Sequence, residues 1–192
     1  MLTFAHEGIA YPLLFIMLPK RGNSNSLERI ALPQRYVNLF GGESIVCLRS
    51  DREYIRDNWT GWLNENQIRY HIRIKEIFWV DNSRRGGHAK AYWLLLRLKV
   101  GQTTYLPRIH YIKGQAYYLS VKRVKRRDRA PDLQVIVSFN RHDKAVKTYR
   151  RHWKIETMLK TLKSAGFNIE DTHLKDLNCI GKLPPLVMIA FV

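Results

Sequence analysis

One segment in the C-terminal half groups side chains that can do chemistry on one face of a helix. Residues 144–164 have a helical hydrophobic period, and at ~100° per residue Tyr149, His152, Glu156 and Lys163 share a sector of roughly 60°. Apolar side chains fill the adjoining sector: Ile155, Met158, Leu159 and Leu162. Glu156 therefore lies at the border of a face that should be buried. The alternative is an exposed ion pair of Glu156 with Lys160, worth ~0.3–0.5 kcal/mol.

Asp51 is a second carboxylate in a position that suits ligand binding. It follows the apolar segment 44–49, which is predicted to be a buried strand. Ligands of open α/β sheets bind at the carboxyl ends of the strands. A local alternative is that Asp51 caps the helix predicted after it.

The first 75 residues alternate between strand and helix patterns. Strands are expected at 2–5, 9–18, 44–49 and 68–74, and helices at 26–40 and 53–67. The second strand is almost continuously apolar, which is typical of a strand buried on both faces. Pro33 is expected to kink or shorten the first helix, and Gly41-Gly42 to end it. This order predicts an α/β domain with a mixed sheet.

Residues 76–140 have a different, β-rich pattern. Strands are expected at 77–80, 91–100, 105–112, 115–124 and 133–139, with turn signals at 85–88, 101–102 and 113–114. We interpret 76–140 as a basic insertion between residues 1–75 and residues 141–192, which begin with the helix described above. The tryptophans are expected to pack in the core or the sheet, with stacking on a splayed base as the alternative: Trp59, Trp62, Trp79, Trp93 and Trp153.

The positive charge of the chain is concentrated in one stretch. The net charge is +17, and residues 84–163 contain 21 Lys and Arg but only four acids, so the remainder is neutral. Such a charge indicates a polyanionic partner, nucleic acid first and an anionic membrane surface second. A content of 45% hydrophobic and 11% aromatic residues excludes a disordered basic tail. Segment 122–129 has six basic residues, and it is either a phosphate-binding site or a solvated loop.

Neither cysteine spacing nor hydropathy indicates an extracellular or membrane protein. Cys47 and Cys179 lack the spacing of a zinc site or a disulfide framework, so we expect a reduced, intracellular protein. The apolar run 9–18 is too short to span a bilayer. We therefore expect a soluble, cytoplasmic protein.

Several segments together resemble bacterial insertion-sequence transposases of the DDE class, which have an RNase H-like fold. They are residues 9–15, 19–26, 50–53, 149–157 and 164–173. The family signature on the last catalytic helix is Y-x2-R-x3-E-x6-K. Tyr149, Glu156 and Lys163 match its spacing, whereas His152 stands at the arginine position. The resemblance implies an RNase H-like mixed sheet flanked by helices and interrupted by the β-rich insertion.

The resemblance also implies a catalytic triad of Asp, Asp and Glu that holds two divalent metal ions, Mg²⁺ or Mn²⁺. Asp51 would be the second acid and Glu156 the third, both as catalytic and metal-binding residues. One metal ion activates the attacking water or 3′-hydroxyl and the other stabilises the leaving oxygen. The expected DNA-binding residues are Tyr149, His152, Lys163, Arg52, Lys122, Arg123, Lys125, Arg126 and Arg127.

The first acid of the triad is not found in this sequence. In the family it ends a strand that would precede Leu2, and neither Glu7 nor Glu43 is a convincing substitute. The chain also stops inside the apolar run 183–192. We therefore expect a piece of a longer protein that has little or no catalytic activity on its own.

The predicted function is that of a transposase fragment. It would bind double-stranded DNA, both transposon ends and target, as a dimer or higher multimer in the bacterial cytoplasm, associated with the nucleoid when bound. The complete protein would catalyse metal-dependent DNA strand cleavage and transfer. The alternative is an inactive DNA-binding remnant, or a regulator of a full-length transposase. A basic RNA-binding domain is a third hypothesis, but it explains neither Asp51 nor the helix signature.

Overall fold

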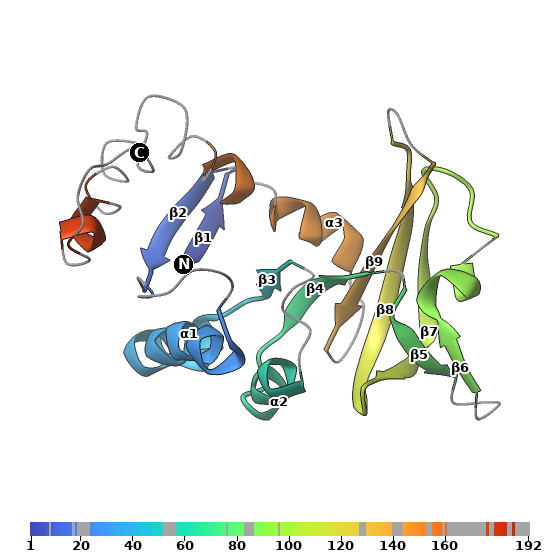
Figure 1. The fold of residues 1–192 in the computed structure, drawn as a ribbon, viewed down its shortest axis with the longest axis horizontal. Helices are drawn as coiled ribbons and strands as arrows, with labels where there is room; N and C mark the ends of the chain where they lie inside the picture. The colour runs from blue at the N-terminus through green and yellow to red at the C-terminus, as the bar shows by residue number, and fades with distance from the viewer. Residues whose placement is uncertain are drawn as a thin grey trace. The chain divides into compact units, whose positions relative to one another are not determined.

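The computed structural model describes most of the chain in two separate units. Described are residues 1–7, 9–16, 18, 24–51, 57–75, 77–82, 87–95, 97–126, 130–139, 144–152, 155–158, 160, 176, 179–183 and 186. One unit combines Met1–Phe40 with Arg151–Val192, and the other is Gly41–Arg150. The first has a two-stranded sheet and the second a seven-stranded sheet (Figure 1).

The first unit begins with an antiparallel hairpin of β1 (Leu2–His6) and β2 (Ile9–Leu14). Both strands were predicted, but the second ends at Leu14 instead of residue 18. The expectation that the second is buried on both faces is wrong, because Ile9 and Leu13 are exposed. In the described structure β2 pairs only with β1, so this small sheet cannot bury both of its faces.

Helix α1 (Ser26–Phe40) has the predicted bounds. It starts with a capping box, in which the Glu28 amide donates to Asn25 Oδ1 (2.9 Å) and the Asn25 amide donates to Glu28 Oε2 (2.7 Å). Pro33 lies inside the helix without shortening it. The helix ends before Gly41, whose φ of 77° favours glycine.

The second unit is built on one mixed sheet of order β3-β4-β9-β8-β7-β5-β6. The strands are β3 (Leu48–Ser50), β4 (Tyr70–Ile74), β5 (Trp79–Asn82), β6 (Gly87–Lys90), β7 (Thr103–Ile112), β8 (Gln115–Val124) and β9 (Asp132–Ser138). β3 and β4 are parallel, and the other neighbours are antiparallel. The mixed α/β fold is therefore confirmed and is compatible with an RNase H-like fold. The division at 75/76 and 140/141 stays a prediction, and strands on both sides of residue 75 share this sheet.

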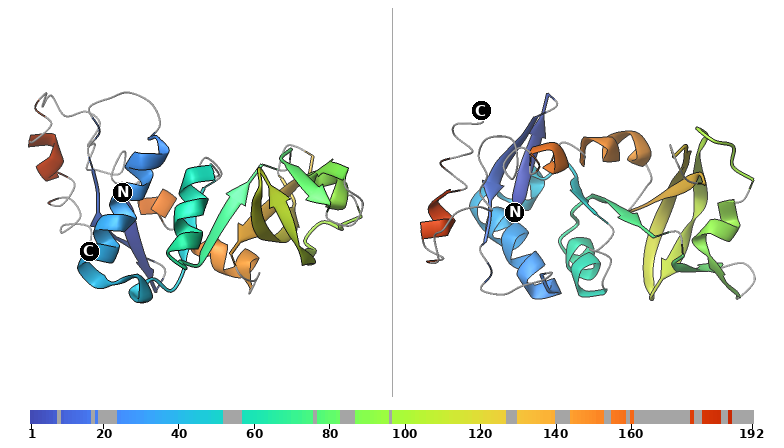
Figure 2. Two further views of the ribbon diagram at one scale, coloured as in Figure 1. Left: turned by 90° about the horizontal axis from the view of Figure 1, so that it is seen from below. Right: turned by 45° about the horizontal axis from the view of Figure 1, so that its top comes forward.

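Two helices cover opposite faces of this sheet (Figure 2). Helix α2 (Asp57–Glu65) buries Trp59 and Leu63, and its Thr60 hydroxyl lies 2.8 Å from the Tyr117 hydroxyl of β8. Helix α3 (Ala145–Tyr149) packs against Ile136 of β9. Ile136 pairs with Ser120 of β8, whose side chain points away from that of Tyr117 because residues alternate along a strand.

Other predicted strands are also wrong in part. The segment 44–49 was expected to be a buried strand, but the strand is only Leu48–Ser50, preceded by the 3-10 turn η1 (Gly42–Ser44). Val46 is 83% exposed. The segment 91–100 begins as the 3-10 helix η3 (Ala91–Leu95), whereas β6 occupies part of a predicted turn. A short apolar run such as 91–95 fits a strand and a helix equally well, so its period does not show which one forms. In the structure β6 pairs with β5, and the 3-10 helix follows β6.

The tryptophans differ in burial. Trp59 is buried, as predicted, whereas Trp79 and Trp93 are 58% and 57% exposed and do not pack in the core; Trp79 lies on strand β5. Trp153 lies outside the described residues. Among the helices that the structure describes, none is both long and apolar enough to cross a membrane.

Candidate carboxylate site and nucleic-acid interface

Asp51 follows directly after β3, at the carboxyl end of the parallel pair β3–β4. This is the predicted position, although the strand is shorter than expected. Ser50 before it is buried, and Asp51 itself is partly exposed. The position leaves a carboxylate at the sheet edge where α/β folds bind ligands.

Glu156 belongs to the other unit. It lies in the helical residues 155–158, with an exposed side chain, while Met158 is buried. His152 is the last residue of the 3-10 turn η4 (Arg150–His152) and is partly exposed. The helical prediction is therefore confirmed for 145–149, 155–158 and 160, whereas 150–152 form a 3-10 turn. The approach of Glu156 to Asp51 stays a prediction.

Tyr149 is a core residue of the second unit. Its side chain is 2% exposed and belongs to a buried cluster with Ile136, Ala145 and Val146. The preceding Thr148 hydroxyl lies 2.8 Å from His71 Nδ1 of β4, which fastens α3 to the sheet. The sequence period placed Tyr149 beside the apolar sector but did not show this burial. Its contact with a DNA phosphate stays a prediction.

The side chains around His71 were not recognised from the sequence. Cys47 Sγ lies 3.5 Å from His71 Nδ1, and burial raises the pKa of the Cys47 thiol. A raised pKa favours the protonated thiol over the thiolate, which is the nucleophilic form. Cys47 directly precedes β3, and its contact with His71 links the start of that strand to its parallel neighbour β4.

Four of the predicted DNA-binding residues gather at one end of β8. Lys122 and Arg123 lie on the strand, and Lys125 and Arg126 follow it, both exposed. Arg123 donates to the Leu98 carbonyl at 2.7 Å. Because successive residues of a strand point to opposite faces, Lys122 and Arg123 lie on different faces of the sheet, and the contacts of the four residues with DNA phosphates stay predictions.

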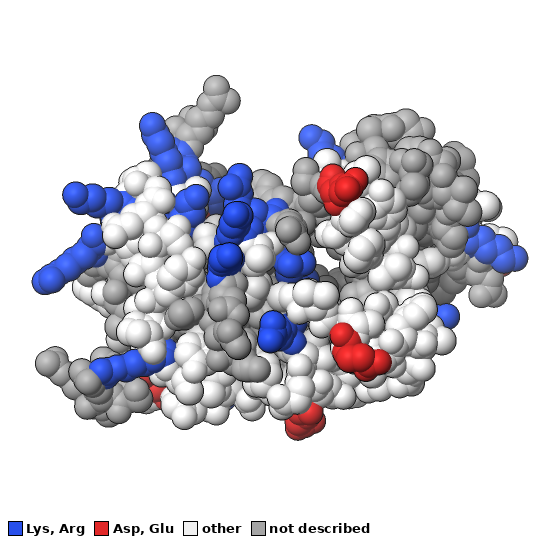
Figure 3. Space-filling view, turned by 180° about the vertical axis from the view of Figure 1, so that it is seen from behind, with Lys and Arg blue, Asp and Glu red and all other residues white. Residues whose placement is uncertain are grey.

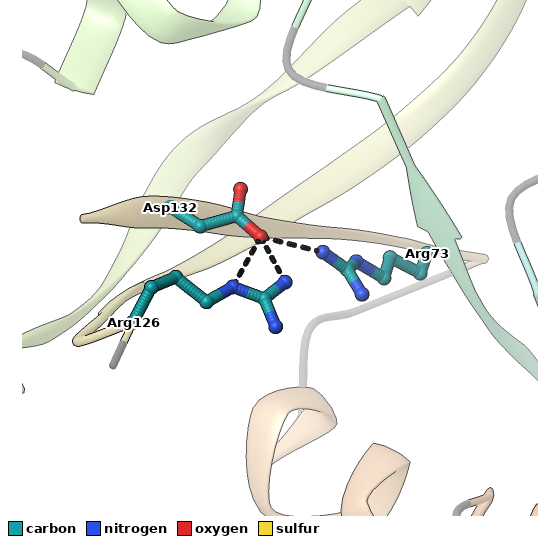
Figure 4. A network of polar contacts seen from close by, with 3 residues as sticks. All are labelled: Arg73, Arg126 and Asp132. Carbon is teal, nitrogen blue, oxygen red and sulfur yellow. Dashed lines mark hydrogen bonds and ion pairs between the residues drawn. The ribbon is translucent and has the colours of Figure 1, made fainter. Parts of the chain in front are cut away.

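Asp132 holds Arg126 in place at this end of the sheet (Figure 4). Arg126 Nε donates to Asp132 Oδ2 at 3.2 Å, Arg126 Nη2 contacts the same oxygen, and Arg73 Nη2 of β4 lies 3.1 Å from it. Two guanidinium groups thus share one carboxylate oxygen, so the cluster of three side chains keeps a net positive charge.

Basic side chains stand out over the seven-stranded sheet (Figure 3). On the face drawn there, Lys and Arg side chains are numerous over this unit and acidic side chains are few. Arg52, Arg127 and Lys163, the other predicted DNA-binding residues, lie outside the described residues.

No group of three or more His, Cys, Asp or Glu side chains within the described ranges is arranged to hold a metal ion. Of the predicted ligands, Asp51 is at a suitable strand end and Glu156 is in the other unit. These two carboxylates do not by themselves form a ligand set for two cations.

Comparison with known proteins identifies a family for this chain. No curated protein matches the chain. The family model described as "Transposase DDE domain" matches residues 39–180, which is well over half of the chain and includes Asp51, the seven-stranded sheet and Glu156. Members of this family generally use divalent metal ions and act on DNA. The chain therefore belongs to the transposase DDE domain family.

Proposed function

We propose that this chain is the catalytic region of a DNA transposase of the insertion-sequence type, which binds transposon ends and takes part in metal-dependent strand cleavage and transfer. The observation that carries the proposal is Asp51 at the carboxyl end of β3, inside the region that matches the DDE domain. The basic end of β8 supports DNA as the substrate, because Lys and Arg neutralise phosphates.

In this proposal Asp51 and Glu156 are the metal-binding carboxylates and act as the second and third acids of the triad. A divalent ion bound there would polarise the scissile phosphate and activate the attacking oxygen. Tyr149, His152, Lys163 and Arg52 would contact DNA near the cut, and the residues at the end of β8 farther along it. Assembly as a multimer on paired DNA ends belongs to the same proposal.

The test measures cleavage and joining of DNA that carries the element's own ends, with Mg²⁺ or Mn²⁺, by the full-length protein. Asp51→Asn and Glu156→Gln are each expected to lower the rate roughly 100-fold or more, the scale seen on removal of one preorganised electrostatic group. Glu65→Gln is the matched control, because Glu65 is an exposed carboxylate on α2.

Two results would contradict the proposal. If both variants cleave as fast as the unaltered protein, these carboxylates are not the metal ligands. If the protein binds DNA but cleaves none with either metal, it is the DNA-binding remnant or regulator instead.

A further inference from the structure

Helix α3 is attached to the sheet by a polar bond as well as by apolar packing. Its apolar side chains pack on Ile136 of β9, and its Thr148 hydroxyl lies 2.8 Å from His71 Nδ1 of β4. His71 is only 8% exposed, so this bond is largely shielded from water. A hydrogen bond is directional, whereas apolar packing is not, so a buried bond of this kind fixes where a helix lies.

The position of α3 depends on such tertiary contacts. The helix has five residues, and a helix this short is unstable in isolation. Among the described residues, Lys144 at its N-cap has a φ of 50° and gives no side-chain capping hydrogen bond. The Thr148 hydroxyl also lies 3.2 Å from the carbonyl oxygens of Lys144 and Ala145, at the start of the helix. The contact with His71 therefore holds the whole of α3 on β4.

His71 also lies beside the strand that ends before Asp51. It pairs with Arg49 of β3, and Asp51 comes two residues after Arg49. Cys47 Sγ, from the residue before β3, lies 3.5 Å from His71 Nδ1. His71 thus connects α3 to the parallel pair of strands that carries Asp51.

We propose that His71 is a positioning residue, which holds α3 through Thr148 and so limits where Glu156 can lie when it binds a metal ion together with Asp51. Glu156 follows Thr148 by eight residues, after the 3-10 turn η4 and within the helical residues 155–158. Oxygen ligands of Mg²⁺ must lie about 2.0–2.1 Å from the ion, so a displaced α3 would weaken the site. The inference rests on the proposed function, in which both carboxylates bind the metal.

The test measures Mn²⁺ binding to the full-length protein with DNA that carries the element's own ends already cut, from the electron paramagnetic resonance signal of free Mn²⁺. Thr148→Val removes the hydroxyl but keeps the branched shape of the side chain. It is expected to weaken Mn²⁺ binding by roughly 10-fold, the lower end of the range for residues that orient metal ligands. Thr148→Ser keeps the hydroxyl and should retain most of the affinity.

Thr60→Val is the matched control, because it removes a buried hydroxyl from α2 that is bonded to Tyr117 instead. A loss of stability alone would affect Thr60→Val and Thr148→Val alike, so only Thr148→Val should weaken Mn²⁺ binding. His71→Leu should have the same effect as Thr148→Val. The double variant should bind no more weakly than either single one, because both changes remove one bond.

The role of His71 is overturned if Thr148→Val and Thr60→Val bind Mn²⁺ with equal affinity, or if the effects of Thr148→Val and His71→Leu add. Asp51→Asn distinguishes that result from a failure of the proposed function, since it removes a proposed ligand and should itself weaken Mn²⁺ binding. If Asp51→Asn leaves the Mn²⁺ affinity unchanged, Asp51 is not a metal ligand, and the proposed function and the role of His71 fail together.

Discussion

At the scale of single residues, Asp132 shows how a basic region is kept in one conformation. Arg73 comes from β4 and Arg126 from the end of β8, and without a counter-charge they would repel each other. The carboxylate lies at the first position of β9, so it also ties the start of that strand to β4. Charge-assisted hydrogen bonds of this kind are stronger than neutral ones.

Asp132→Asn is therefore expected to lower the free energy of unfolding by about 1–2 kcal/mol, since it removes the charge from a partly buried acceptor shared by two arginines. Urea unfolding followed by tryptophan fluorescence measures this. Glu65→Gln, which removes an exposed acid from α2, should change stability by less than about 0.5 kcal/mol. Equal midpoints for the two variants would mean that the Asp132 network does not stabilise the fold.

The sequence predicted the place of Asp51 better than the environment of the other site residues. An acid after an apolar segment is a local signal, so the position of Asp51 was predicted correctly although the bounds of the strand were not. The burial of Tyr149 depends on Ile136, which is distant in the sequence, so no local period could show it. The exposure of Trp79 likewise depends on which face of the sheet is left uncovered.

At the scale of elements, the accurate predictions are those with strong local signals at both ends. Helix α1 has Asn25 and Glu28 at its start and glycines after it, and β8 begins after the turn Lys113-Gly114. The errors fall where local signals are weak. The run 91–95 is aromatic and apolar without a clear period, and its structure is determined by the hairpin β5–β6 before it, including the bond from the Ala91 amide to the Phe78 carbonyl at 2.9 Å.

The contact between α2 and β8 joins two elements that are far apart in the sequence. The hydroxyl groups of Thr60 and Tyr117 are buried and 2.8 Å apart. Tyr117→Phe is expected to destabilise the protein by about 1–2 kcal/mol, because the Thr60 hydroxyl loses this buried partner. Tyr111→Phe, at an exposed tyrosine, serves as the control for the same chemical change.

A double-mutant cycle with Thr60→Val isolates the interaction. Thermal or urea unfolding of the two single variants and the double variant should give a coupling energy of at least about 0.5 kcal/mol. Additive effects would show that the two hydroxyl groups do not stabilise the packing of α2 on β8.

At the scale of the whole molecule, the basic segment and the strands β3 and β4 belong to the same seven-stranded sheet. The charge distribution indicated a neutral part and a cationic part, and the β-rich pattern of 76–140 suggested an insertion. The structure joins β3 and β4 to the strands of the cationic part through β9, so Asp51 and the basic end of β8 belong to one unit. Only long-range strand pairing could reveal this, and the sequence of a single chain carries no local signal for it.

This arrangement predicts that duplex DNA binding depends on the charge of the unit Gly41–Arg150, which contains the seven-stranded sheet, rather than on the total charge of the chain. The affinity should fall steeply with salt, because each phosphate neutralised by Lys or Arg releases counterions. Lys125→Gln should reduce the slope of log affinity against log salt concentration by about 0.9, the contribution of one phosphate contact on B-DNA. Lys182→Gln removes the same charge from an exposed lysine of the other unit, outside the cationic stretch, and should leave the slope unchanged. Equal slopes for the two variants would mean that net charge alone attracts the DNA, and that the end of β8 is a solvated loop rather than a phosphate-binding site.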